Sequence, residues 1–226
     1  MHHRRSHDDL LARAESSSGC LDGVFEQALG ILGCVTIADV DNRRNTLIRE
    51  ASRLFRDKGY DRTTVRDIAR AVGLQSGSIF YHFRNKEEIL QAVMENSIRR
   101  IIEAARAALD GVVSPRERLT VLTRSHLEIL LGGTQDDMFV LLYEWRSLPG
   151  ALRRPLLELR AAYERIWREV VTAACEEGLL RGEPALTARL MLGTLNWTVQ
   201  WYQPGGGLTP SQLGDRVLDM LLHDGD

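Results

Sequence analysis

The sequence lacks the features that would place the protein in a membrane or outside the cell. No apolar run approaches the roughly 18 residues that a membrane-spanning helix needs, so we expect no membrane contact. Only three of the 226 residues are cysteines, and they are far apart: Cys20, Cys34 and Cys175. An odd number of scattered cysteines, with no secretory signal before them, indicates neither a disulfide framework nor a metal site. We therefore expect a cytoplasmic protein, with a redox-sensing role for one of these thiols as the alternative.

Common enzyme signatures are also missing. The sequence contains no G-x-S-x-G, no H-E-x-x-H and no glycine-rich phosphate loop. The glycines from Gly205 to Gly207 follow a predicted helix and lack the strand and the lysine that a phosphate loop needs. We therefore expect no catalytic residues, no metal ligands and no cofactor, and we predict that the protein is not an enzyme.

The small net charge of −2 conceals an uneven distribution. Residues 43–86 contain eleven basic and four acidic residues, whereas residues 1–42 contain three and seven, and residues 87–226 contain fifteen and twenty. This division is typical of a segment that binds a polyanion, joined to an acidic remainder. A basic face that meets only solvent is the alternative.

The basic segment contains the pattern of two short helices joined by a tight turn. Thr64 and Asp67 have the spacing of a capping box, and Gly73 can adopt the left-handed conformation that ends a helix. Ser76 is the candidate N-cap of the second helix. We assign three apolar residues to the buried side of that helix: Ile79, Phe80 and Phe83. Its outer surface then carries small or polar residues, which can enter a major groove without steric conflict: Gln75, Ser76, Gly77, Ser78, Tyr81 and His82.

Three stretches of this segment resemble the signature of the TetR-type transcriptional regulators: Arg66 to Ala69, Gly73-Leu74, and Gly77 to Lys86. The resemblance covers about 45 residues. It departs from the family at Phe80, where a tyrosine is common, so a hydroxyl contact with phosphate is lost there. A compact three-helix subdomain without DNA binding is the alternative. The resemblance implies that double-stranded operator DNA is the partner and that these residues contact it: Thr64, Arg66, Gln75, Ser76, Gly77, Ser78, Tyr81, His82 and Lys86.

Helical periodicity and helix start and stop signals predict an all-α fold of about nine helices with no strand. The predicted helices cover residues 42–58, 64–72, 76–83, 86–105, 115–132, 135–148, 151–177, 184–202 and 210–222. Asn85 and Glu88 are predicted to form a capping box at the start of the fourth helix. Residues 1–40 form an extension outside the family pattern, with a possible amphipathic helix from Leu21 to Leu32 or no role at all. We divide the rest into a helix-turn-helix domain, residues 41–86, and a ligand-binding and dimerisation domain, residues 87–226.

The resemblance implies that the second domain holds a ligand pocket. Candidates for its wall are Leu122, His126, Phe139, Tyr143, Glu144, Trp145, Arg146, Tyr163, Trp167 and Trp197. Ordinary core packing is the alternative for each of them. Because one helix-turn-helix reads few base pairs, a homodimer is expected, with the last two helices as its interface: Gly193, Trp201, Leu213, Val217 and Leu221.

The resemblance thus implies a ligand-responsive repressor that a small apolar effector releases from its operator. Leu195 to Trp197 and Trp201 to Gly206 are similar to the C-terminal part of TetR-type regulators of fatty-acid and steroid catabolism, which implies an acyl-CoA thioester as effector. A regulator of efflux or stress genes that responds to a lipophilic or aromatic compound is the alternative. A non-regulatory DNA binder would need basic charge over the whole surface, whereas residues 87–226 are acidic.

Overall fold

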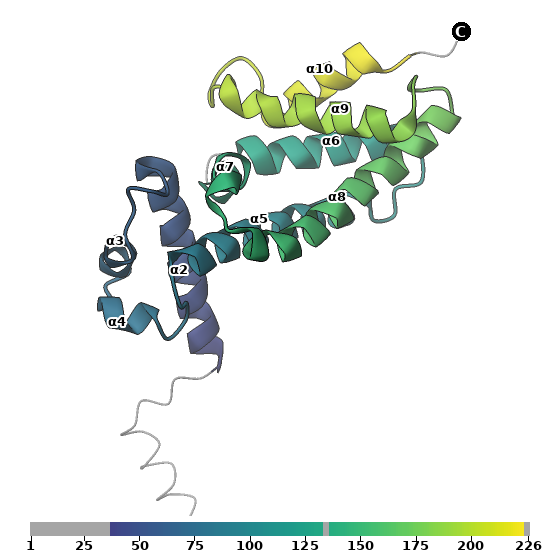
Figure 1. Ribbon diagram of the computed structural model, residues 1–226. Coiled ribbons are helices and arrows are strands. Elements are labelled where there is room, and N and C mark those ends of the chain that lie inside the picture. The colour runs from purple at the N-terminus through teal and green to yellow at the C-terminus, as the bar shows by residue number, and fades with distance from the viewer. Residues whose placement is uncertain (1–36, 133–135, 224–226) are drawn as a thin grey trace, which may run out of the picture. The chain divides into compact units, whose positions relative to one another are not determined.

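The computed structural model describes residues 37–132 and 136–223, with side chains from Asn42 onward (Figure 1). These ranges contain nine α-helices, two short 3-10 helices and no β-strand, which confirms the predicted all-α fold. The candidate amphipathic helix from Leu21 to Leu32 lies outside the described residues. From Thr46 onward the chain forms one compact unit, and every contact below lies within it.

The first three helices form the predicted helix-turn-helix arrangement. They are α2 (Ile37–Lys58), α3 (Val65–Ala71) and α4 (Ser76–Ile79). α2 begins before the predicted start at Asn42, because no proline or glycine interrupts residues 37–42. The apolar stripe predicted for this helix is buried: Leu47, Ile48, Ala51, Leu54 and Phe55.

α5 (Lys86–Leu109) connects this head to the body of the unit. Three helices pack against it: α6 (Pro115–Leu131), α7 (Asp136–Tyr143) and α8 (Gly150–Glu176). Because α5 begins beside the head and lies among the body helices (Figure 1), a shift of the body against it can reach the head.

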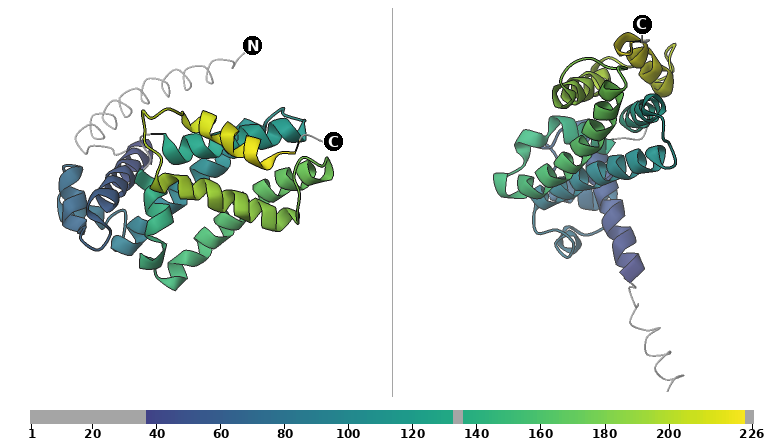
Figure 2. Two further views of the ribbon diagram at one scale, coloured as in Figure 1. Left: turned by 90° about the horizontal axis from the view of Figure 1, so that it is seen from above. Right: turned by 90° about the vertical axis from the view of Figure 1, so that its right-hand side faces the viewer.

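Two further helices form a layer on the side of the body away from α5 (Figure 1, Figure 2). α9 (Pro184–Trp197) packs against α8, and α10 (Pro210–Leu221) packs against α6. A short 3-10 helix, Thr198–Gln200, follows α9. The predicted helix to Tyr202 is therefore too long, because the hydrogen bonding changes type after Trp197.

The predicted helix over residues 135–148 is also shorter in the structure. α7 ends at Tyr143, and a separate 3-10 helix covers Trp145–Ser147. Met138 and Val140 are buried as predicted, but Tyr143 is exposed. The apolar residues continue beyond the end of α7, so a prediction from composition alone made this helix too long.

Helix starts follow the local signals with one correction. Prolines occupy the first turn at three predicted positions: Pro115, Pro184 and Pro210. Asn85 caps α5, accepting a hydrogen bond from the backbone N–H of Glu88 at 2.8 Å. The carboxylate of Glu88 accepts instead from the backbone N–H of Arg84 at 2.8 Å, so the predicted reciprocal capping box is not formed. The glutamate side chain is long enough to reach past the cap residue.

One contiguous apolar core runs from Leu47 in α2 to Leu218 in α10, with Trp167 as its largest fully buried side chain. A few polar side chains lie inside it, among them His126 and Asp137. None of the helices in the described ranges is long and apolar enough to cross a membrane.

Candidate functional site

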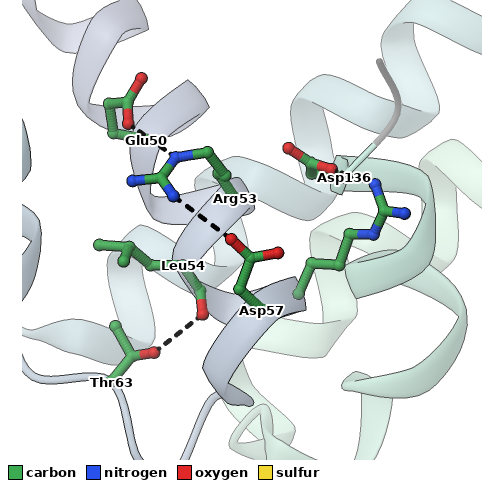
Figure 3. Close-up of polar contacts among 7 residues, drawn as sticks. Glu50, Arg53, Leu54, Asp57, Thr63 and Asp136 are labelled. Carbon is green, nitrogen blue, oxygen red and sulfur yellow. Dashed lines mark hydrogen bonds and ion pairs between the residues drawn. The ribbon is translucent and has the colours of Figure 1, made fainter. Parts of the chain in front are cut away.

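Thr64 fixes the start of α3 through the predicted capping box. Its hydroxyl oxygen accepts from the backbone N–H of Asp67 at 3.1 Å, and the carboxylate of Asp67 accepts from the backbone N–H of Thr64 at 3.0 Å. The backbone N–H of Thr64 and its hydroxyl, which donates to the same carboxylate at 2.7 Å, lower the pKa of Asp67. Thr63, beside it, is buried and donates its hydroxyl to the carbonyl of Leu54 (Figure 3). The same hydroxyl also lies in hydrogen-bond contact with the carbonyl of Gly59. α3 is therefore held firmly against the end of α2.

The turn between α3 and α4 forms as predicted, but two assignments for α4 are corrected. Gly73 adopts φ +69° and ends α3. Gln75, rather than Ser76, is the N-cap residue of α4, and its side chain makes no capping bond. Phe80 is 56% exposed, whereas Ile79 and Phe83 are buried. Residues 79 and 83 are one turn apart on the inward face, so a side chain one position after Ile79 is rotated by about 100° toward solvent.

The predicted DNA-contacting residues lie mostly on the surface of this turn and α4. Thr64, Arg66, Gln75, Gly77, Ser78 and Tyr81 are exposed, and Ser76, His82 and Lys86 are half-buried. Tyr81 is 77% exposed and meets the ring of His82 edge to face at 5.2 Å. The structure thus brings these small and polar side chains to one end of the unit. Their contacts with DNA stay a prediction.

Lys86 has a structural role that the sequence did not indicate. Its ammonium donates to the carbonyls of Tyr60 at 2.9 Å and Thr63 at 3.1 Å, and it lies 4.0 Å from the centre of the Tyr60 ring. Lys86 therefore connects the first turn of α5 to the loop between α2 and α3. If this ammonium also contacted a DNA phosphate, its N–H donors would be divided between the phosphate and the carbonyls of Tyr60 and Thr63.

Two polar contacts join α2 and its following loop to the region of α7. The guanidinium of Arg56 donates to the carboxylate of Asp136, the first residue of α7, at 2.5 Å. The backbone N–H of Tyr60 donates to the carboxylate of Glu144 at 3.3 Å. Arg53, on the same stretch of α2, is paired instead within its own helix, with Glu50 and Asp57 (Figure 3). Arg56 is thus the residue of this stretch that reaches the body.

The neighbouring residue Asp137 ties α7 to α5. Its side chain is 6% exposed and accepts from Arg100 at 2.8 Å. Burial of a charge is costly unless it is paired, so this contact holds α7 at a defined place on α5. Two consecutive carboxylates at the start of α7 therefore contact two different elements, α2 and α5.

The body contains a cavity of about 650 Å³, which is within the size range of small-molecule sites. Its wall comes from five helices and the 3-10 turn after α7. Three of the predicted residues line it: His126, Trp145 and Tyr163. The prediction did not include the others: Ile98, Ile101, Met138, Leu141, Leu142, Arg160, Glu164, Arg189, Leu192, Gly193 and Asn196.

His126 is one of the polar residues that line this cavity. It is 2% exposed, and its Nδ1 lies 2.8 Å from the hydroxyl of Tyr163. Burial lowers the pKa of His126 to about 4, and the Asn196 amide offsets part of this shift. Burial also raises the pKa of Tyr163. Both side chains are therefore uncharged at neutral pH.

The other predicted pocket residues lie elsewhere. Leu122 and Trp167 are fully buried core residues. Phe139 and Tyr143 pack ring on ring at 4.3 Å, and the Tyr143 hydroxyl accepts a hydrogen bond from Gln200. The two charged candidates do not line the cavity. Glu144 contacts the loop after α2, and Arg146 is exposed. The last candidate, Trp197, lies on the outer face of α9.

That outer face forms an apolar groove between α9 and α10. Four of the five predicted dimer residues line it: Gly193, Trp201, Leu213 and Val217. Leu221 packs against the core instead. Trp197 and Met220, which also line the groove, are 64% and 83% exposed. So large an apolar surface on two adjacent helices is typical of a protein interface.

These features agree with the comparison to known proteins. Residues 47–93 match the family "Bacterial regulatory proteins, tetR family", and residues 112–224 match the "Tetracyclin repressor-like, C-terminal domain". The HTH-type transcriptional repressor KstR2 of Mycobacterium tuberculosis is 32% identical over 188 residues, which cover 81% of this chain and 92% of that protein.

Two solved structures have similar folds. AibR, crystallised in complex with isovaleryl coenzyme A and operator DNA, has a TM-score of 0.73 at 28% identity, covering 79% of this chain and 97% of its own. The superantigen PfiT has a TM-score of 0.72 at 44% identity, covering 80% and 97%. The family matches at both ends of the compact unit, together with the exposed helix-turn-helix, show that this chain belongs to the tetR family of DNA-binding bacterial regulators.

Proposed function

We propose that the protein is a homodimeric repressor that an acyl-CoA thioester releases from its operator. One observation carries the proposal: the helix-turn-helix and a cavity of ligand size are joined by the same two helices. α5 supplies Ile98 and Ile101 to the cavity, and α7 supplies Met138, Leu141 and Leu142. α5 also begins at the head, and α7 contacts it through Asp136.

This connection suggests how an effector weakens DNA binding. A ligand that fills the cavity meets α5 and α7 directly, and both helices contact the head. If the ligand prefers an arrangement in which the two heads of the dimer no longer fit successive major grooves, it weakens DNA binding by its differential affinity. The division into a DNA-binding domain, residues 41–86, and a ligand-binding and dimerisation domain, residues 87–226, follows from this proposal.

The chemistry of the cavity supports a thioester of coenzyme A. Its inner wall is mostly apolar and suits an acyl group, whereas two arginines, Arg160 and Arg189, lie at exposed positions of its lining. Arg160 is paired with Glu164 at 2.9 Å, and Arg189 lies near enough to Glu183 to help lower the pKa of that carboxyl. Guanidinium groups bind phosphates well. AibR, which was crystallised with isovaleryl coenzyme A, has a similar fold.

The groove between α9 and α10 is the proposed contact with the second subunit, where two copies would form a four-helix bundle. The family consists of transcriptional regulators, and we infer that this chain has no enzymatic activity and acts in the cytoplasm. A regulator of efflux or stress genes is the second candidate, because the aromatic residues Trp145 and Tyr163 in the cavity also suit an aromatic compound.

The test is fluorescence anisotropy on DNA from the flanks of the protein's own gene, with and without long-chain acyl-CoA. We expect tight, sequence-selective binding that the thioester releases and coenzyme A alone does not. Release by aromatic compounds but by no thioester would favour the second candidate. Failure to select any DNA sequence would contradict the proposal as a whole.

A further inference from the structure

An apolar ring is exposed at the end of the unit that carries the predicted DNA contacts. Phe80 is 56% exposed, and the next residue, Tyr81, is 77% exposed. No other large apolar or aromatic side chain is exposed between Asn42 and Asn85. A single exposed apolar residue carries little information by itself, so the surroundings of Phe80 decide its role.

Gly77 lies one turn before Phe80, on the same exposed side of the chain. The backbone N–H of Phe80 donates to the carbonyl of Gly77 at 3.3 Å, and helical residues three positions apart are surface neighbours. Gly77 lies inside α4, and a methyl group added to it would meet no described atom within 4 Å. Glycine destabilises a helix relative to alanine, and packing within this chain does not require it here. A glycine at such a position permits a ligand to approach the backbone closely.

The surroundings of these two residues identify duplex DNA as that ligand. Residues 43–86 contain eleven basic and four acidic residues, and this segment matches the tetR family. Gln75 and Ser78, which flank Gly77, are exposed. In the major groove a thymine presents its C5-methyl group, an apolar feature that phenylalanine can contact. Because Gly77 has no side chain, a base edge can reach the ring of Phe80 without obstruction from the preceding turn.

We propose that Phe80 is a specificity-determining residue that contacts the C5-methyl group of a thymine in the operator. Gly77 permits the close approach of DNA that this contact needs. The inference rests on the proposed binding of operator DNA by this end of the unit. It assigns direct base readout to Phe80, whereas the hydroxyl of Tyr81 is suited to the phosphate backbone.

The experiment removes thymine methyl groups from the operator that the full-length wild type selects from random duplexes. Deoxyuridine keeps the hydrogen-bonding groups of thymine and lacks only its C5-methyl group. At one thymine position in each half-site, we expect deoxyuridine to weaken wild-type binding about fourfold, and about 15-fold when both half-sites are changed, which corresponds to one buried methyl group per half-site. Phe80→Ala should bind the thymine and deoxyuridine operators equally. Fluorescence anisotropy at one fixed salt concentration measures both affinities.

Two further variants separate base readout from other effects. Tyr81→Phe is the matched control, because it alters the neighbouring aromatic residue and keeps its ring. It should weaken both operators alike and retain the wild-type preference for thymine. Gly77→Ala should be at least as stable as the wild type in urea, because the added methyl group has room and alanine favours a helix. Its operator affinity and its preference for thymine should both fall.

A folded Phe80→Ala variant that keeps the wild-type preference for thymine at every position would overturn the inference. A wild type that binds the thymine and deoxyuridine operators equally would overturn it too, and so would full operator affinity in Gly77→Ala. Failure of the proposed function is recognised earlier, in the selection step. A wild type that selects no DNA sequence would reject both proposals, whereas selective binding with no response to deoxyuridine would reject this inference alone.

Discussion

Replacing His126 should change how the stability of the protein depends on pH. Burial lowers the pKa of His126 to about 4 in the folded protein, whereas an unfolded histidine titrates near 6.5. Below pH 6.5 the unfolded chain therefore binds more protons than the folded one, and stability falls as pH falls toward 4. The whole shift corresponds to about 3 kcal/mol per chain, and about a tenfold loss in the folding equilibrium constant is expected between pH 7.5 and pH 5.5.

The assay is urea unfolding of wild type and His126→Gln at pH 7.5 and pH 5.5, at one protein concentration because a dimer's stability depends on it. Gln retains a polar group of similar size but does not titrate. The variant should lose less stability on acidification than the wild type, by about 1 kcal/mol. The matched control is His223→Gln, which removes the same titratable group from an exposed position, and it should retain the wild-type dependence. Equal acid sensitivity of wild type and His126→Gln would refute the reasoning.

Three further predictions concern the head and its contact with the body. Thr64→Ala removes the α3 cap and should cost about 1 kcal/mol in unfolding experiments without DNA; an unchanged free energy would show that the cap is not stabilising. Asp136→Asn should alter the free energy of unfolding by less than about 1 kcal/mol, because the ion pair with Arg56 is partly exposed. The same variant should show a smaller loss of DNA affinity when the effector binds. Equal release of wild type and variant from DNA would exclude this contact from the coupling. Gln75→Ala should change the selected operator sequence, whereas Tyr81→Phe should weaken binding to all sequences alike, and a binding-site selection distinguishes these outcomes.

Much of the fold was predictable because its signals are local. The capping pair Thr64 and Asp67 acts over three residues, and the left-handed turn depends on Gly73 alone. The prolines at the helix starts act within one turn. Such features are present in the sequence itself, and the helix-turn-helix and its exposed polar face were predictable for this reason.

The cavity was less predictable because its wall depends on long-range packing. The ring stacking and hydrogen bond between His126 and Tyr163 join residues 37 positions apart, and the contact between Arg56 and Asp136 spans 80. Aromatic content suggested Trp167, which proved to be core, whereas Asn196 carried no signal beyond its place in a stretch similar to family members. Phe80 was misassigned because α4 has only one turn, too short for periodicity to separate its faces.

The short helix α7 has the properties that a coupling element needs. Its eight residues are too few for a stable isolated helix in water, which needs roughly 12–15 residues, so its position depends on what it contacts. One side is held by the ion pair between the buried Asp137 and the half-buried Arg100 on α5, and its first residue is held by Arg56 of the head. Three of its apolar side chains, Met138, Leu141 and Leu142, line the cavity. A ligand there changes the surroundings of a helix with little stability of its own, so the contact with the head is where its effect would be transmitted.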